Sequence, residues 1–219
     1  MTNELLAKHD VKATYTPEAL LENFVGQNFR GMMIGLQKKH NFTMEPQELE
    51  DYVDAELGKV VEKLNEKAEA VPGVPEELEK LKEKGYPMAV VSTSAKPRVV
   101  ASLEKTGLMK YFTYEHVYSA ATSLNPPSSK PDPKIYLYAC EQLGVKPEET
   151  VTVEDSKSGA TAAMRANIPC IGYVGIYGLE EGKAKMDQME KVLANDTKCA
   201  VIMHDWKDFE KCLEKIESL

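Results

Sequence analysis

Side chains of three chemical kinds stand at positions in this sequence where they could bind an anion together. Two hydroxyls and two carboxylates each follow a short apolar run, and a lysine lies before a Pro-Asp-Pro segment. They are Ser92, Thr93, Lys130, Glu154 and Asp155. Hydroxyl and ammonium groups donate hydrogen bonds to phosphate oxygens, whereas carboxylate oxygens are ligands that Mg²⁺ accepts. The set therefore predicts a phosphate group bound beside a divalent cation.

Each of these segments also has an ordinary structural interpretation. Serines after a strand commonly form turns, and an acidic pair before a helix commonly caps it. A lysine before proline is usually a solvated surface residue. Their order along the chain and their shared position next to expected elements favour the functional interpretation.

The elements that would position these side chains lie in the second part of the chain. Short apolar runs there alternate with helical patterns of about ten residues. Strands are expected at 88–91, 151–153, 170–174 and 200–203, and helices at 76–84, 99–105, 134–143, 159–167 and from 205 onward. The alternation predicts βαβ units and one parallel sheet covered on both faces. Ligands bind such sheets at the carboxyl ends of the strands, where the hydroxyls and carboxylates stand.

The first part of the chain has a different pattern. Residues 1–70 are predicted to be helical, with Thr16 as an N-cap before Pro17 and a long helix that begins at Pro46. The Val-Pro-Gly-Val-Pro segment at 71–75 marks the change of pattern. We therefore expect a helical domain over 1–70 and an α/β domain over 71–219.

Composition sets limits on the class of protein. The 219 residues are 42% hydrophobic and 28% charged, which is typical of a globular chain and not of a disordered or membrane protein. The net charge of −8 and the lack of a basic run argue against a nucleic-acid partner. The four cysteines form no CxxC pair, and neither a signal-peptide pattern nor a membrane-spanning run is found. A cytoplasmic protein with free thiols is expected.

The polar segments resemble the motifs of the haloacid dehalogenase-like hydrolases. The likeness is strongest to the β-phosphoglucomutase-type phosphatases and mutases, which carry a helical cap. The runs Ala-Val-Val-Ser at 89–92, Ser-Lys-Pro-Asp-Pro at 129–133 and Val-Glu-Asp-Ser at 153–156 match the second, third and fourth motifs of the family. The resemblance implies a Rossmann-like core with an N-terminal helical cap. It also implies hydrolysis or transfer of the phosphoryl group of a small phosphorylated metabolite.

The resemblance further implies a role for each matched residue. Ser92 would bind phosphate, Lys130 would steady the phosphoryl group, and Glu154 and Asp155 would hold Mg²⁺. The cap loop at 25–30 stands where the family reads its substrate. Candidate substrate contacts there are Gln27, Asn28 and Arg30. Ordinary polarity of a helix linker explains that loop equally well.

One motif of the family has no match in this sequence. The family's first strand ends in Asp-x-Asp, whose first carboxylate attacks phosphorus and whose second is the general acid and base. The segment Asp10–Thr14 has Asp and Thr at the right separation, but Lys12 replaces the second acid, and residues 3–9 have helical spacing. We expect the first core strand to be absent.

The absent motif leaves several possibilities open. The chain could be a truncated phosphatase or a catalytically dead member that binds phosphate or a protein. The gap that a missing central strand would leave exposes backbone groups that are costly to bury unpaired. The core could repack around that gap, or a homodimer could fill it by strand exchange.

Overall fold

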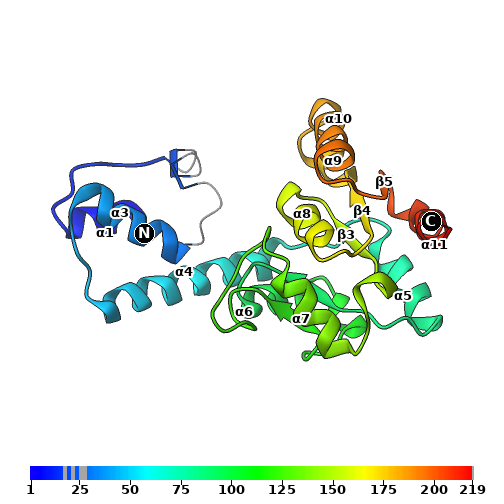
Figure 1. Cartoon of the computed structure of the whole chain (residues 1–219). Helices are drawn as coiled ribbons and strands as arrows, with labels where there is room; N and C mark the ends of the chain where they lie inside the picture. The colour runs from blue at the N-terminus through cyan, green and yellow to red at the C-terminus, as the bar shows by residue number, and fades with distance from the viewer. Residues whose placement is uncertain (17–18, 21–22, 25–28, 219) are drawn as a thin grey trace. The chain divides into compact units, whose positions relative to one another are not determined.

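The computed structural model describes residues 1–16, 19–20, 23–24 and 29–218 (Figure 1). The chain divides into two compact units, Met1–Lys63 and Leu64–Leu219. The second unit contains the site residues predicted around the strands, and the first contains the predicted substrate-reading loop. No helix in the described ranges combines the length and the apolar character needed to cross a membrane.

The first unit is built from helices, as the sequence predicts. They are α1 (Thr2–Lys8), α3 (Phe29–His40) and α4 (Pro46–Lys67), whose last residues belong to the second unit. Leu5, Leu6, Met33 and Leu36 are fully buried and form the centre of its core. The hydroxyl of Thr16 accepts a hydrogen bond of 3.2 Å from the Ala19 N–H, which is the expected capping contact. Pro17 lies outside the described residues.

The Asp10 segment has no strand before it. Residues 2–8 form α1, and Asp10 lies in the turn that follows, with a φ of 58°. The helical spacing predicted for residues 3–9 is therefore confirmed.

The second unit contains five short strands, all paired in parallel, among its described residues. They are β1 (Val90–Ser92), β2 (Val117–Ser119), β3 (Thr152–Glu154), β4 (Cys170–Tyr173) and β5 (Val201–Met203). The prediction of parallel pairing is confirmed. The prediction of a single sheet is wrong, because β1 and β2 form one sheet and β3, β4 and β5 form another. Strand β2 was not expected, since its three residues carry no apolar run.

Helices precede, connect and follow these strands. The α-helices are α5 (Val74–Glu83), α6 (Lys96–Lys105), α7 (Lys134–Leu143), α8 (Lys157–Arg165), α9 (Gly175–Glu180), α10 (Lys183–Lys191) and α11 (Phe209–Glu217). Shorter turns are the 3-10 helices η1 (Leu108–Tyr111), η2 (Pro147–Glu149) and η4 (Trp206–Asp208) and the π-helical η3 (Val192–Asp196). Helix α7 ends at Gly144, whose φ of 67° lies in the left-handed region that glycine adopts readily.

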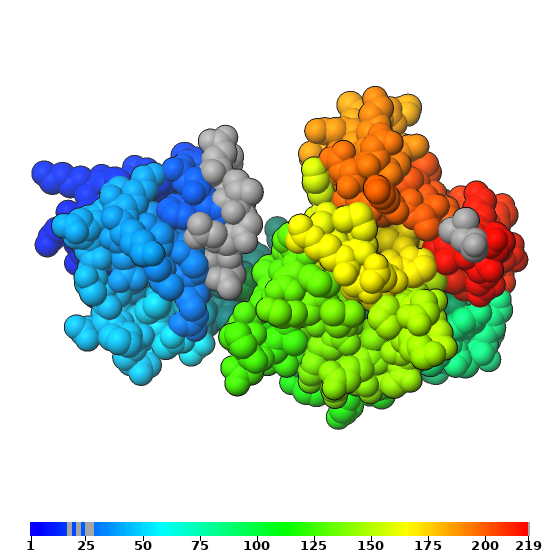
Figure 2. All heavy atoms as spheres, viewed as in Figure 1, coloured from blue at the N-terminus to red at the C-terminus, as the bar shows by residue number. Residues whose placement is uncertain are grey.

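Both faces of the larger sheet are covered, as the sequence predicts. Along β4, Cys170 packs into a cluster with the alanines of α8, whereas Ile171 packs with Phe209 and Ile216 of α11. Neighbouring residues of a strand point to opposite faces, so α8 and α11 lie on opposite sides of this sheet (Figure 1). Helices α9 and α10 pack against each other, and their yellow-orange and orange atoms lie together in the space-filling view (Figure 2). The fold is a Rossmann-like α/β core with an N-terminal helical cap.

Candidate functional site

A cavity of about 280 Å³ lies at the carboxyl ends of β1 and β3. Its wall is mostly polar and carries hydroxyl, ammonium and carboxylate groups. The lining residues are Val91, Ser92, Thr93, Lys130, Val153, Glu154, Asp155, Ser156 and Ser158. The five residues that the sequence predicts around the strands therefore line one cavity, although they come from three separate segments of the chain.

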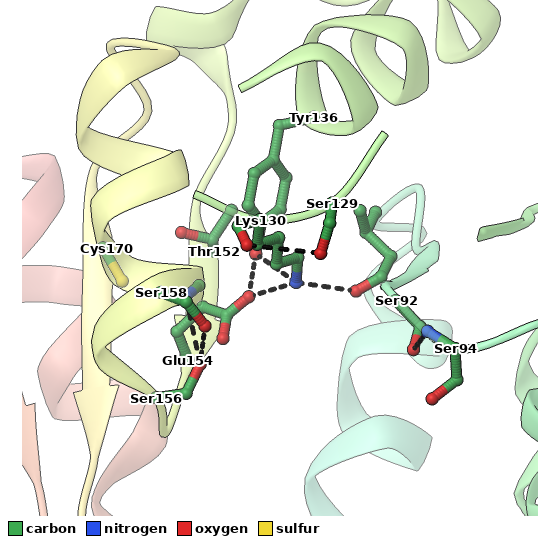
Figure 3. Close-up of polar contacts among 12 residues, drawn as sticks. Ser92, Ser94, Ser129, Lys130, Tyr136, Thr152, Glu154, Ser156, Ser158 and Cys170 are labelled. Carbon is green, nitrogen blue, oxygen red and sulfur yellow. Dashed lines mark hydrogen bonds and ion pairs between the residues drawn. The ribbon is translucent and has the colours of Figure 1, made fainter. Parts of the chain in front are cut away.

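The Lys130 ammonium is the centre of a hydrogen-bond network in this cavity (Figure 3). Its Nζ donates to the Val91 carbonyl at 2.9 Å and to the Tyr136 hydroxyl at 3.1 Å, and it forms an ion pair with Glu154. An ammonium has three N–H donors, so this network engages all of them. The Lys130 side chain is only 8% exposed.

The Val91 carbonyl is available to Lys130 because of the pattern of parallel pairing. Val90 N–H donates to the His116 carbonyl at 2.9 Å, and the Ser92 carbonyl accepts from Ala120 N–H at 2.8 Å. These groups face β2, so the backbone groups of Val91 between them point to the opposite edge of the strand.

The same alternation holds on β3. Thr152 N–H donates to the Pro169 carbonyl at 3.0 Å, on the β4 side. The backbone groups of Val153 therefore point away from β4, and Val153 lines the cavity that β1 also borders. The Lys130 side chain connects these two sheets, since it bonds Val91 on β1 and Glu154 on β3.

Glu154 is buried, at 8% exposure, and its carboxylate is held by two donors, Lys130 and the Tyr136 hydroxyl. Burial and the neighbouring Glu154 charge raise the pKa of Tyr136, so this phenol stays protonated and donates. Sequence reasoning missed Tyr136, because a tyrosine on an amphipathic helix looks like an ordinary core residue.

Gly159 gives the Glu154 carboxylate its space. A Cβ at this position would lie 1.8 Å from Glu154 Oε2, so a side chain here would collide with the carboxylate. Gly159 N–H also donates to the Ser156 hydroxyl at 3.0 Å, which caps α8. The sequence signal that could have indicated the role of Gly159 is a glycine three residues after an N-cap serine.

The remaining predicted residues are more open to solvent. Ser92 is partly buried, and its hydroxyl accepts a hydrogen bond of 3.1 Å from Ser94 N–H. Thr93 and Asp155 are exposed on the cavity wall. The Asp155 carbonyl accepts from the Tyr177 hydroxyl at 3.0 Å, which ties the residue's backbone to α9.

The metal prediction fits this arrangement in part. In the described ranges, no group of three or more His, Cys, Asp or Glu side chains gathers around a common point. Asp155 presents an exposed carboxylate, while Glu154 is already paired with Lys130. Mg²⁺ commonly takes only one or two protein carboxylates and fills its remaining positions with water and phosphate oxygens. The donor set therefore suits Mg²⁺ together with a phosphate better than Mg²⁺ alone.

The predicted substrate contacts of the first unit divide into two groups. Gln27 and Asn28 lie outside the described residues. Arg30 lies in the first turn of α3, and its guanidinium forms a two-pronged ion pair with Glu50, with an Nη2 to Oε2 distance of 2.5 Å. This hydrogen bonding raises the pKa of Arg30 and lowers that of Glu50.

The comparisons with known proteins agree with this fold. Residues 1–173 match the haloacid dehalogenase-like hydrolases, and the chain belongs to that family. Over 116 residues it is 38% identical to a phosphorylated carbohydrates phosphatase of Thermotoga maritima. That match covers 53% of this chain and 51% of the relative, so the chain spans about half the length of the curated relatives it matches.

Two solved structures show the same fold. CbbY from Rhodobacter sphaeroides, in complex with phosphate, matches with a TM-score of 0.70 at 22% identity, over 94% of this chain and 86% of that one. β-Phosphoglucomutase from Clostridium difficile matches with a TM-score of 0.70 at 18% identity, over 96% and 86%. At these identities the likeness establishes the architecture, and activity must be argued from the site.

Proposed function

We propose that the cavity binds the phosphate group of a small phosphorylated metabolite. The observation that carries this proposal is the convergence of the Lys130 ammonium with the Ser92 and Thr93 hydroxyls on one polar wall. Such donors stabilise a phosphate dianion, most strongly where they are partly shielded from water. The family's hydrolases and the names of the relatives, among them phosphoglycolate phosphatases, support this class of ligand.

Binding of phosphate requires an exchange of partners at Lys130. All three of its donors are engaged, so one must turn from the Glu154 carboxylate or the Val91 carbonyl to a phosphate oxygen. Mg²⁺, held by Asp155 and Glu154, would neutralise phosphate charge when bound. The pairing of Glu154 with Lys130 leads us to expect that phosphate and Mg²⁺ bind better together than separately.

We propose further that these residues bind phosphate esters without hydrolysing them efficiently. Among the described residues that line the cavity, the carboxylates are Glu154 and Asp155. Glu154 is held by Lys130 and Tyr136, and Asp155 is assigned to the metal, which leaves neither free to attack phosphorus. The family's hydrolysis or phosphoryl transfer is the alternative, and turnover decides between them. Gln27, Asn28 and Arg30 remain the proposed substrate contacts of the cap.

Isothermal titration calorimetry with inorganic phosphate, with and without MgCl₂, tests the binding proposal. Ser92→Ala should weaken phosphate binding about tenfold, the equivalent of one hydrogen bond to a charged group, and Asp155→Asn should remove the effect of Mg²⁺. Lys134→Met, at an exposed position outside the cavity wall, is the matched control and should bind as the unaltered chain does. Absence of phosphate binding in both conditions would sink the proposal.

A phosphate-release assay on a panel of sugar phosphates tests the second proposal. We expect phosphate binding with no release above background. Turnover that Asp155→Asn abolishes would instead establish the chain as a phosphatase and would overturn the binding-only assignment.

A homodimer completed by strand exchange is a second candidate arrangement. It is favoured by the positions of β1 and β3 at the edges of their sheets among the described strands, since both edges border one cavity and are connected by a lysine side chain. Light scattering on the purified chain should give twice the mass of 24.4 kDa. A monomeric mass at high protein concentration would rule this arrangement out.

The four free cysteines support the proposal of a reducing, cytoplasmic location.

A further inference from the structure

Two of the cysteines lie side by side on neighbouring strands. Cys170 begins β4, and Cys199 lies just before β5, where the Ala200 N–H donates to the Cys170 carbonyl at 2.9 Å. In the register of these strands Ile171 is opposite Val201, so Cys199 stands one residue before the position opposite Cys170.

Both sulfur atoms lie on the same face of the sheet. The Cys199 Sγ lies above Gly172, where an added Cβ would be only 3.2 Å from it. Cys170 and Gly172 are two residues apart on one strand and therefore share a face. Both cysteines also belong to the apolar cluster that packs under α8. The Cys170 Sγ donates to the Ile171 carbonyl at 3.7 Å, and the Cys199 Sγ lies 3.4 Å from the Thr197 hydroxyl.

The environment makes Cys199 the nucleophile of the pair. The neighbouring Cys170 thiol, aided by the Thr197 hydroxyl at 3.4 Å, lowers the pKa of Cys199 to about 7. The same contact and its deep burial raise the pKa of Cys170. Cys199 is only partly buried, whereas Cys170 is 4% exposed. A thiolate with partial access to solvent next to a buried thiol is the arrangement of an attacking and a resolving cysteine.

We propose that Cys170 and Cys199 form a peroxide-sensitive dithiol site. The Cys199 thiolate attacks one oxygen of hydrogen peroxide, the O–O bond breaks, and the departing hydroxide takes a proton to become water. The resulting sulfenic acid is attacked by the Cys170 sulfur. A disulfide forms, and the sulfenic hydroxyl leaves with the Cys170 proton as a second water. Two thiols are oxidised and one peroxide is reduced, and a thiol reductant reverses the change.

The site lies one strand away from the phosphate cavity. Gly172, beneath the Cys199 sulfur, is the register partner of Glu154 on β3. The proposal is nevertheless independent of phosphate binding, because it rests on the placement of the two sulfurs on neighbouring strands and on the partial exposure of Cys199.

Peptide mass spectrometry of the full chain after treatment with hydrogen peroxide tests the proposal. Free thiols are blocked with iodoacetamide before digestion, and the four cysteines fall in four different tryptic peptides. We expect one cross-linked pair of peptides, containing Cys170 and Cys199, that disappears on reduction. Cys140 and Cys212, both buried, are internal controls and should remain free thiols. Absence of the cross-link, or equal oxidation of all four cysteines, would overturn the proposal.

A substitution and a pH series identify the attacking sulfur. In Cys170→Ser, a dimedone probe should trap sulfenic acid at Cys199, and the cross-link should be lost. Trapping should fall about tenfold from pH 8 to pH 6, because the thiolate fraction of a group with a pKa near 7 falls by that factor. Trapping at Cys140 or Cys212, or no dependence on pH, contradicts the assignment of Cys199. If Cys170→Ser does not fold, the cross-link in the unaltered chain still tests whether the two cysteines form a disulfide.

Discussion

The ion pair between Lys130 and Glu154 makes the sharpest quantitative prediction. Both side chains are 8% exposed, so removal of either partner leaves the other charge buried. Breaking a buried pair in this way costs about 3–5 kcal/mol. We expect Lys130→Met to destabilise the second unit by about that amount. Glu154→Gln should cost somewhat less, because the ammonium keeps the Val91 carbonyl and the Tyr136 hydroxyl as acceptors.

The double variant distinguishes the ion pair from simple packing. When both charges are removed, no unpaired charge remains, and the double variant should be more stable than the sum of the single effects by about 2 kcal/mol. Urea unfolding followed by the fluorescence of the only tryptophan, Trp206, measures this in the second unit. At a slope of about 2 kcal/mol/M, a loss of 3 kcal/mol moves the midpoint by about 1.5 M.

The exposed pair of Lys134 and Asp132 is the matched control. Its atoms are 3.2 Å apart, but the side chains are 65% and 33% exposed. Removing its charges should cost less than about 1 kcal/mol. Two results would refute this prediction: each single substitution at Lys130 and Glu154 lowers the free energy of unfolding by less than about 1 kcal/mol, or the two effects simply add in the double variant. Either result would mean that the Lys130–Glu154 ion pair does not stabilise the core.

Two further substitutions test the surroundings of Glu154. Gly159→Ala should lower the free energy of unfolding in urea by about 2–3 kcal/mol, because its Cβ would overlap the Glu154 carboxylate. Gly58→Ala is the control and should raise that free energy by about 0.5–1 kcal/mol, because no atom lies within 4 Å of an added Cβ there. Equal effects of the two substitutions would contradict this steric account. The raised pKa of Tyr136 means that above about pH 10 the unfolded chain loses this proton while the folded chain keeps it. The free energy of unfolding should therefore fall as pH rises above 10, and in Tyr136→Phe it should fall less steeply by about 1.4 kcal/mol per pH unit. Equal slopes in Tyr136→Phe and in the control variant Tyr86→Phe would refute this account.

Local signals in the sequence predict many elements of the fold. The helix over 134–143 is found with its predicted bounds, because Gly144 is a local signal that ends a helix. The long helix from Pro46 and the strand at 170–173 follow similarly from a helix-start proline and a buried apolar run. By contrast, β2 is formed by pairing with β1, and its short Val-Tyr-Ser segment carries little signal of its own.

The site shows the same division between local and tertiary information. Ser92 and Asp155 line one cavity, as their positions at strand ends predict, and Lys130 joins them from the segment before α7. Position in the sequence could not predict that Lys130 bonds the Val91 carbonyl, since that depends on which edge of β1 is left open. Nor could it predict the contribution of Tyr136, whose hydroxyl meets Glu154 only after α7 packs on the sheets.

The position of Lys130 has a consequence for how the molecule responds to its ligand. A single ammonium group connects two sheets and also faces the cavity in which the anion is proposed to bind. A ligand that attracts this group must weaken the connection between the sheets before its own contacts replace it. The same three N–H donors of Lys130 therefore serve both the connection between the sheets and the binding of the anion. Any change that strengthens the contacts of Lys130 within the core will weaken binding in the cavity.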